Sequence, residues 1–401
     1  MRPARNLLAF GLLLSILSGA SAQTTAGGVW VADTINSHAL GKRSIIVATP
    51  EGYNEGKSPY PILVLLDAND RPMFRLWTAQ AAYLADNSPG LPPVIAVGIP
   101  NGSDRIHDMT PPATGSSVKE FPNAGGAAAF ADFIIGEVLP YVRARYRTLP
   151  AVFLTGHSAG GLFAVYVAAH KPGAFQGVIA TSPALWFNDQ TLVDAYADLM
   201  GQSRLHPRIF VTSGGDEPDI IAATKRFAER LGTHASLSGT FAYRSYPDAT
   251  HQLTPMSVGD GLRFIFEPVS FKHLAFERLD FAKVDSATLN AAIQSSESTY
   301  AAAARSLGLS EQLPEQILNG LGYRLINRNK VPLAISVFKR NIRAYPQSVN
   351  VYDSLADGFL AAADSASALA QLRTALQVAH SLGAQVPAET QRKLEALEAK
   401  K

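Results

Sequence analysis

The Gly-x-Ser-x-Gly turn at residues 156–160 constrains the fold of this chain more than any other stretch. An apolar, strand-like run at 152–154 leads into the turn, and an apolar run with helical spacing follows it at 162–169. A nucleophile elbow requires this order of strand, tight turn and helix, because the serine must stand at a sharp bend clear of the sheet. Glycines on both sides of the serine tolerate the strained backbone. We therefore predict that Ser158 is a nucleophile and that the amide of Ala159, at the helix start, faces a developing oxyanion.

Strand-like apolar runs alternate with segments of helical spacing as far as Pro268. The other strand-like runs lie at 29–35, 43–49, 62–66, 94–99, 177–181, 208–212 and 240–246. Helices are expected just after Pro72, at 127–145 and near 190–200, 218–231 and 255–266. Because strands joined by helices run parallel, this alternation predicts an α/β-hydrolase fold, a mostly parallel sheet with helices on both faces. The first two runs should pair as an antiparallel edge.

The predicted nucleophile needs partners, since a serine hydroxyl requires a base and the base requires a carboxylate to orient it. In α/β-hydrolase topology these groups follow the order serine, acid, histidine along the chain. His251 lies just past the last strand-like run, so we predict that it is the base. For His38, His157 and His170 we expect, respectively, solvation, packing beside the elbow and a favourable interaction with the helix dipole.

The acid is expected in the loop that ends the strand-like run before the last one. Glu217 and Asp216 compete for this role, and Asp219 is a weaker third candidate. Asp248 is a further candidate, although a solvated surface position accounts for it more simply. The residues alone leave the choice open, because a carboxylate near a helix start is also stabilised by the helix dipole.

A second oxyanion donor should come from the loop after the buried strand-like run at 62–66. We predict the backbone amide of Asn69, with Ala68 as the alternative, because both follow that run closely. A plain turn also accounts for these residues, since Asn and Asp favour turns. A second loop, at 100–126, is rich in Pro, Gly and Ser and is long enough to be a functional insertion.

Residues 1–22 have the organisation of a secretory signal, which predicts an exported protein, either periplasmic or secreted. Arg2 and Arg5 precede an apolar run, and small residues then offer a cleavage site before Gln23. The apolar run is too short for a membrane span, so we expect no span after cleavage.

The composition narrows the chemistry further. The chain has 0 cysteines, which excludes disulfides, thiolate metal sites and a cysteine nucleophile. No metal-ligand spacing is visible, so we expect neither a metal nor a cofactor. Loss of the signal removes two arginines and takes the formal net charge of +2 to about 0, which gives no indication of a nucleic-acid partner.

Beyond Pro268 the pattern is helical only, and we predict a catalytic domain at 23–270 followed by a small all-helical domain at 271–401. Matching positions recur 34 residues apart: Leu321 and Leu355, Gly322 and Ala356, Ala334 and Ala368, Phe338 and Leu372. This period is typical of tetratricopeptide helix pairs, and an ordinary helical hairpin is the alternative. Such pairs need neighbours, so we expect them to pack on the catalytic domain or on a third, degenerate pair near 280–310.

Taken together, these stretches resemble the esterase D-like family of α/β hydrolases. That family includes bacterial siderophore esterases, S-formylglutathione hydrolase and mycolyltransferases. The resemblance is carried by residues 65–67, 97–101, 105–111, 133–140, 156–164, 182–186, 251 and 261–264. It is nearest to bacterial enterochelin-type trilactone esterases, and the helical tail resembles tetratricopeptide extensions of some bacterial members.

The resemblance implies roles for individual residues. Ser158, Glu217 and His251 take the triad roles, because the family pattern Gly-x-x-Glu falls on 214–217. This favours Glu217 as the acid. No metal belongs to such a triad.

The resemblance also implies residues beside the triad. Arg105 and Asp108 correspond to a pair that braces the loop next to the active site, and a surface ion pair would be the plainer interpretation. Trp186 corresponds to a residue that lines the substrate pocket, although a core position suits tryptophan as well.

The sequence thus predicts an exported serine esterase that forms an acyl-enzyme on Ser158 from a small-molecule ester. A narrower hypothesis is hydrolysis of siderophore trilactones, which the resemblance alone suggests. A hypothesis of another class is a non-catalytic protein whose helical tail binds a protein partner.

Overall fold

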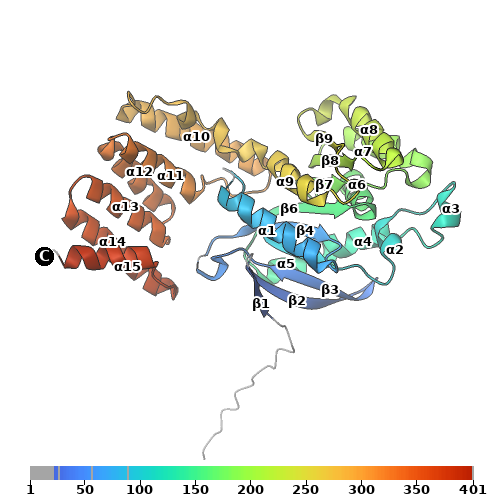
Figure 1. Cartoon of the computed structure of the whole chain (residues 1–401), viewed down its shortest axis with the longest axis horizontal. Helices are drawn as coiled ribbons and strands as arrows, with labels where there is room; N and C mark the ends of the chain where they lie inside the picture. Colours follow the sequence, from blue (N-terminus) through green and yellow to red (C-terminus); the bar gives the residue numbers. More distant parts are fainter. Residues whose placement is uncertain (1–21, 26–27, 56, 88–89, 400–401) are drawn as a thin grey trace, which may run out of the picture.

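A computed structural model describes residues 22–25, 28–55, 57–87 and 90–399 of the 401-residue chain. Apart from Ala22, the predicted signal segment 1–22 lies outside these residues, so the signal stays a prediction. In the described part of the chain, nine strands form one sheet in the order β1-β2-β3-β5-β4-β6-β7-β8-β9 (Figure 1). Their bounds are β1 (Ala22–Thr25), β2 (Gly28–Ser37), β3 (Gly41–Ala48), β4 (Tyr60–Leu66), β5 (Ile95–Ile99), β6 (Thr148–His157), β7 (Gly177–Thr181), β8 (Arg208–Gly214) and β9 (Phe241–Tyr246).

The pairing of neighbouring strands changes once across the sheet, from antiparallel to parallel. The pairs β1–β2, β2–β3 and β3–β5 are antiparallel, whereas every neighbouring pair from β5 to β9 is parallel. This arrangement confirms the predicted α/β-hydrolase fold with an antiparallel edge. The prediction missed β1, which adds one further antiparallel strand outside β2.

Helices connect and cover the strands. Their bounds are α1 (Arg71–Asn87), α2 (Arg105–Met109), α3 (Ser117–Glu120), α4 (Ala127–Phe133), α5 (Leu139–Arg145), α6 (Ala159–His170), α7 (Thr191–Gln202), α8 (Pro218–Gly232) and α9 (Thr254–Ile265). The loop expected at 100–126 contains the short helices α2 and α3. The helix expected at 127–145 is divided by a π-helical turn, η2 (Ile134–Val138), just before Pro140, which cannot donate a backbone hydrogen bond.

Alternate residues of β4 face two different apolar cores. Ile62, Val64 and Leu66 belong to one core, which is completed by side chains of α4 to α8. Leu63 and Leu65 belong to the other, which lies under α1 and α9. Because side chains of a strand alternate between faces, a continuous apolar run such as β4 suits a strand that is buried on both sides.

The chain after α9 is helical in its described part and forms an extension beside the sheet, coloured from gold to red in Figure 1. Its helices are α10 (Ser286–Ser306), α11 (Glu315–Asn327), α12 (Val331–Ala344), α13 (Val349–Ala361), α14 (Ser365–Leu382) and α15 (Ala388–Glu398). Helix α13 begins 34 residues after α11, and α14 begins 34 residues after α12. The structure therefore has the predicted period, while the tetratricopeptide assignment and the domain boundary at 270/271 stay predictions.

The extension shares a core with the sheet. Ile293 of α10, Leu321 of α11 and Phe338 of α12 belong to the same apolar cluster as Phe153 of β6. The backbone amide of Ala151 also donates to the carbonyl of Gly308, 3.2 Å away. In place of the degenerate pair expected near 280–310, the single long helix α10 links the hairpins to the sheet.

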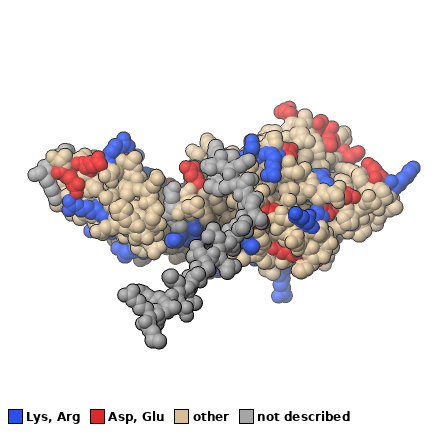
Figure 2. Space-filling model, turned by 90° about the horizontal axis from the view of Figure 1, so that it is seen from below, with Lys and Arg blue, Asp and Glu red and all other residues tan. Residues whose placement is uncertain are grey.

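Charged side chains of both signs are interspersed on the face seen in Figure 2, with no large area of one sign among its described residues. Among the described residues, we find no helix of the length and apolarity needed to cross a membrane. The same residues contain no group of three or more His, Asp or Glu side chains placed to hold a metal ion.

Candidate active site

Ser158 stands at a sharp turn between β6 and α6. Its φ of 60° and ψ of −118° are unfavourable for a residue with a Cβ, which is the strain expected of an elbow. The backbone around it holds this conformation. The amide of Ser158 donates to the carbonyl of Thr181 at 3.0 Å, and its carbonyl accepts the amide of Ala184 at 3.1 Å.

Two glycines make this turn possible. A Cβ on Gly156 would lie 2.2 Å from the carbonyl oxygen of Gly160, so strand and helix could not approach as they do. A Cβ on Gly160 would lie 3.1 Å from Oδ2 of Asp67, in the loop after β4. The elbow and the loop after β4 are therefore in close contact, as a shared oxyanion site requires.

The structure brings Glu217 and His251 together. Oε2 of Glu217, the residue before α8, contacts Nδ1 of His251. The other three acidic candidates, Asp216, Asp219 and Asp248, are exposed. Of the four carboxylates, Glu217 is thus the one that can orient the imidazole.

Glycines also bring these two loops together. The amide of Gly215 donates to the carbonyl of Ala249 at 2.7 Å. A Cβ on Gly214 would lie 2.6 Å from the carbonyl oxygen of Thr250, so a side chain there would separate the loops. The backbone of the acid loop is in this way packed directly on the loop that carries His251.

His157 joins the elbow to His251. Its Nε2 lies 2.8 Å from the backbone oxygen of His251, and the two ring centroids are 4.4 Å apart. Burial, followed by the charge of His251, lowers the pKa of His157 to about 4. The ring therefore stays neutral near pH 7, and it packs the elbow as predicted. The Ser158 hydroxyl itself has no hydrogen-bond partner among the described residues, and apo active sites often lack this bond.

The loop after β4 is held in a left-handed conformation, with a φ of 58° at Asp67. The amide of Ala68 donates a hydrogen bond to the carbonyl of Ile99 at 3.2 Å. The amide of Asn69 has no partner in the described part of the chain, and its side chain accepts the amide of Asn101 at 3.2 Å. Of the two candidates for the second oxyanion donor, Asn69 is the one whose backbone amide remains available to an oxyanion.

The loop-bracing prediction needs a correction, because Arg105 and Asp108 do not pair with each other in the described structure. Arg105 donates to both carboxylate oxygens of Asp67, at 2.5 and 2.9 Å, and to the carbonyl of His157 at 3.0 Å. Asp108 is buried and accepts two hydrogen bonds from Arg43, at 2.7 and 3.0 Å. Both residues brace the site, but each does so with a distant partner.

Trp186 lies two residues beyond Ala184, whose amide binds the elbow. Its ring is half-buried and packs against Phe121, with centroids 5.8 Å apart. The following residues 188–190 all have positive φ, and Asn188 binds the backbone of the 110–121 loop. The rings of Trp186 and Phe121 are thereby fixed beside the segment whose Ala184 amide binds the elbow backbone.

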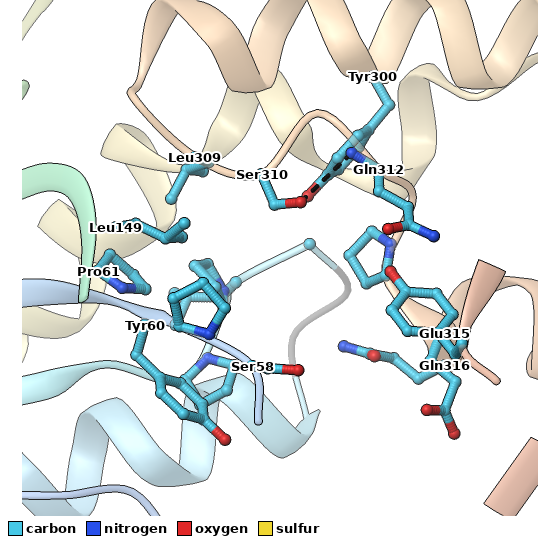
Figure 3. A pocket seen from close by; sticks show the side chains of 17 residues that line it. Ser58, Tyr60, Pro61, Leu149, Tyr300, Leu309, Ser310, Gln312, Glu315 and Gln316 are labelled. Atoms are coloured by element: carbon cyan, nitrogen blue, oxygen red, sulfur yellow. Dashed lines mark hydrogen bonds between the residues drawn. The ribbon is translucent and has the colours of Figure 1, made fainter. Parts of the chain in front are cut away.

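The cavity in Figure 3 lies elsewhere. Its volume is about 350 Å³, and it opens between the first residues of β4 and β6 and the extension. Tyr60 and Leu149 line one side, and Tyr300, Leu309 and Gln312 line the other. Since Ser158 follows the opposite end of β6, this cavity is separate from the catalytic arrangement.

The sequence of the chain matches one known protein family over most of the sheet domain. The model of the esterase family described as "Putative esterase" matches residues 37–260, more than half of the chain. The chain belongs to this family. The match includes the elbow, the acid loop and the loop of His251.

Two relatives of this esterase-family chain are themselves named as esterases. Ferri-bacillibactin esterase BesA of Bacillus subtilis is 28% identical over 235 residues, which cover 52% of this chain and 80% of that protein. The siderophore triacetylfusarinine C esterase of Aspergillus fumigatus is 33% identical over 146 residues, which cover 34% of this chain and 49% of that protein. The chain therefore matches only about half the length of this fungal relative.

Solved structures support the fold. An IroE-like serine hydrolase from Shewanella oneidensis, 22% identical, matches 77% of this chain and 98% of its own, with a TM-score of 0.61. An uncharacterised protein from Capnocytophaga ochracea, 15% identical, matches 92% of this chain and 99% of its own, with a TM-score of 0.58. The second match must include much of the helical extension.

Sequence reasoning missed part of this esterase-family site. Arg43 and Asp67 were not recognised as partners of Asp108 and Arg105, and the hydrogen bond from His157 was not foreseen. Asp67 directly follows a buried strand, and that position was the one available signal. Arg43 carried none, because it lies on β3, far from the site in the chain.

Proposed function

We propose that this chain is an exported serine esterase that hydrolyses carboxylic esters of small molecules through an acyl-enzyme on Ser158. The contact between Glu217 and His251 carries the proposal, because it supplies an oriented base on a loop joined to the elbow by His157. Membership of the esterase family supports the reaction class. Export rests on the signal-like residues 1–22.

The reaction follows from these positions. His251, oriented by Glu217, takes the proton of the Ser158 hydroxyl as that oxygen attacks the ester carbonyl. The amide of Ala159, which has no partner within its own helix, and the amide of Asn69 stabilise the tetrahedral oxyanion. The protonated His251 then gives its proton to the leaving alkoxide, and water releases the acyl group by the same steps.

The test is hydrolysis of a p-nitrophenyl ester by the wild type and by Ser158→Ala, together with labelling by a fluorophosphonate. We expect turnover and labelling in the wild type and neither in the variant. Equal rates for the two proteins would end the proposal. Labelling is informative without knowledge of the substrate, because it reports an activated serine.

Siderophore lactones are the narrower candidate substrate. The names of the relatives from Bacillus subtilis and Aspergillus fumigatus favour it. The wild type should then turn over an iron-loaded trilactone with a much higher kcat/KM than a simple acyl ester. A preference for the simple ester would contradict this narrower assignment and leave the esterase proposal intact.

A protein partner for the helical extension is a separate proposal. The 34-residue register of α11–α12 and α13–α14 supports it, because repeated helix pairs present extended binding surfaces. Substitutions on the exposed face of α13, such as Leu360→Asp, should then reduce recovery of the partner in a pull-down and leave ester hydrolysis unchanged. Unchanged recovery would count against this face as the binding surface.

A further inference from the structure

The His157 side chain makes a hydrogen bond in addition to its packing contacts. It is buried, with 7% of its surface exposed, at the last position of β6, which pairs with Thr181 of β7. Its Nε2 points at the backbone oxygen of His251, and a carbonyl can only accept a hydrogen bond. The proton of this neutral imidazole must therefore be on Nε2, and His157 donates it to the His251 backbone.

The backbone of His157 is fixed from the other side. Its carbonyl accepts a hydrogen bond from Nη2 of Arg105 at 3.0 Å. The same guanidinium binds Asp67 in the loop after β4, which carries Asn69 and is here called the oxyanion loop. A continuous set of hydrogen bonds thus runs from the oxyanion loop through the elbow to the His251 loop. His157 is the member of this set that touches both the nucleophile's strand and the base.

The segment around His251 lies nearer the surface than His157. His251 itself is partly exposed, and Thr250 and Gln252 on either side of it are exposed. The His251 ring contacts the ring of His157 and the carboxylate of Glu217, whose side chain is itself 37% exposed. Without the bond from His157, this segment would keep its contacts with the acid loop and the buried Leu253, but it would lose this hydrogen bond to the strand that carries Ser158.

We propose that His157 is a positioning residue for catalysis: its imidazole N–H fixes the backbone of His251 and so sets the distance between the base and Ser158. This inference rests on the proposed esterase function and deepens it. The bond would matter for kcat and not for substrate binding, because the buried His157 side chain acts on the backbone of the base. A displacement of about 1 Å in such a group can cost about 100-fold in rate.

The test compares three variants in the full chain. His157→Leu removes the donor and keeps an apolar side chain, whereas His157→Gln keeps an N–H near the position of Nε2. His170→Gln, at the exposed end of α6, is the matched control. With a p-nitrophenyl ester, we expect His157→Leu to lose about 10- to 100-fold in kcat with KM changed less than about threefold. His157→Gln should recover most of that loss, and His170→Gln should match the wild type.

The expected split separates positioning from a structural role. A loss in His157→Gln as large as that in His157→Leu would overturn the proposal, as would an unchanged kcat in a folded His157→Leu protein. If His157→Leu does not fold, His157→Asn serves instead, because its amide is too short to reach the His251 carbonyl.

A second readout does not depend on activity. In nitrogen-15 NMR of the histidine rings, the His251 signals should broaden or divide in His157→Leu and stay single in His157→Gln. Unchanged His251 signals in His157→Leu would also overturn the proposal. Absence of turnover and labelling in the wild type would instead overturn the esterase function, and the ring signals would still decide the role of His157.

Discussion

Gly215 and Pro247 approach so closely that a Cβ on residue 215 would lie 1.8 Å from the Pro247 carbonyl oxygen. The contact joins the loop of Glu217 to the loop of His251. Gly215→Ala must therefore move one loop away from the other and lengthen the contact between acid and base. We expect kcat for ester hydrolysis to fall by about 10-fold or more, because the imidazole loses its orientation.

Gly320→Ala is the control for this substitution. Gly320 lies in α11 with open space around the position of a Cβ, so alanine should stabilise the helix by up to about 1 kcal/mol. Its kcat should equal that of the wild type. Full activity in Gly215→Ala would mean that the loops tolerate separation.

Glu217→Gln should lower kcat by about 100- to 10,000-fold, because the neutral amide no longer fixes the tautomer or stabilises the imidazolium of His251. Asp216→Asn, which changes the exposed neighbouring carboxylate in the same way, should stay within about twofold of the wild type. Steady-state hydrolysis of one ester by both variants checks this. A large loss in Asp216→Asn with a small loss in Glu217→Gln would reverse the assignment.

Asp67→Asn should lower both the stability of the protein and its kcat. The Asp67 side chain is 8% exposed, and removal of one partner of a buried pair leaves the Arg105 charge without its counter-ion, at a cost of about 3 kcal/mol. Urea unfolding measures this loss, and kcat should fall too, because the loop of Asn69 is released.

The matched control is Asp132→Asn, which breaks an exposed pair with Lys171 at the molecular surface. It should cost less than about 1 kcal/mol. Similar unfolding free energies for Asp67→Asn and Asp132→Asn would mean that the Asp67 pair is not structural.

The depressed pKa of His157 predicts an acid-sensitive fold. In the unfolded chain the imidazole has its usual pKa near 6.5, whereas burial lowers the pKa of His157 to about 4 in the folded protein. As pH falls, the unfolded state takes up this proton first. Stability is therefore highest above about pH 6.5 and is lost progressively down to about pH 4, by up to about 3 kcal/mol.

His157→Gln removes this proton uptake. The difference in unfolding free energy between wild type and variant should shift in favour of the variant between pH 7 and pH 4. Denaturant unfolding at several pH values measures it, with His170→Gln as the control. Parallel curves for wild type and His157→Gln would contradict the lowered pKa.

Removal of residues 275–401 should destabilise the catalytic domain itself. Phe153 and Phe266 belong to a core that α10, α11 and α12 complete, so the deletion removes a large part of the apolar side chains of that core. We expect aggregation or a markedly lower Tm. Removal of residues 388–401 is the control, because Leu394 of α15 packs in a separate small cluster. An unchanged Tm in the longer deletion would show that the domains are independent.

The fold and the order of the candidate triad could be predicted because both are indicated by short, local stretches of the sequence. An apolar run ends at Leu66, and an elbow motif surrounds Ser158, whichever way the chain folds elsewhere. Parallel strand order then places the loops of Glu217 and His251 on one edge of the sheet. The residues alone left Glu217 and Asp216 open, because the two are adjacent in the chain. The resemblance favoured Glu217, and the structure places Glu217 against His251.

The ion pairs were beyond such reasoning. Arg105 and Asp108 are three residues apart on one short helix, which makes a mutual pair the natural expectation. Asp108 instead points into the interior toward Arg43 on β3, while Arg105 reaches Asp67. The packing of α2 against α4 and α6 determines these partners, and no periodicity in the sequence indicates that packing.

The core shared by Phe153, Ile293 and Phe338 has a consequence for synthesis of the protein. The strands are complete once β9 has been made, and α1 and α9 cover part of one face of the sheet, yet the rest of the apolar core on that face is missing until α10 to α12 follow. A ribosome adds roughly 5–20 residues per second, so the nascent sheet is exposed for several seconds. We expect the chain to reach its native state only after release of its last third.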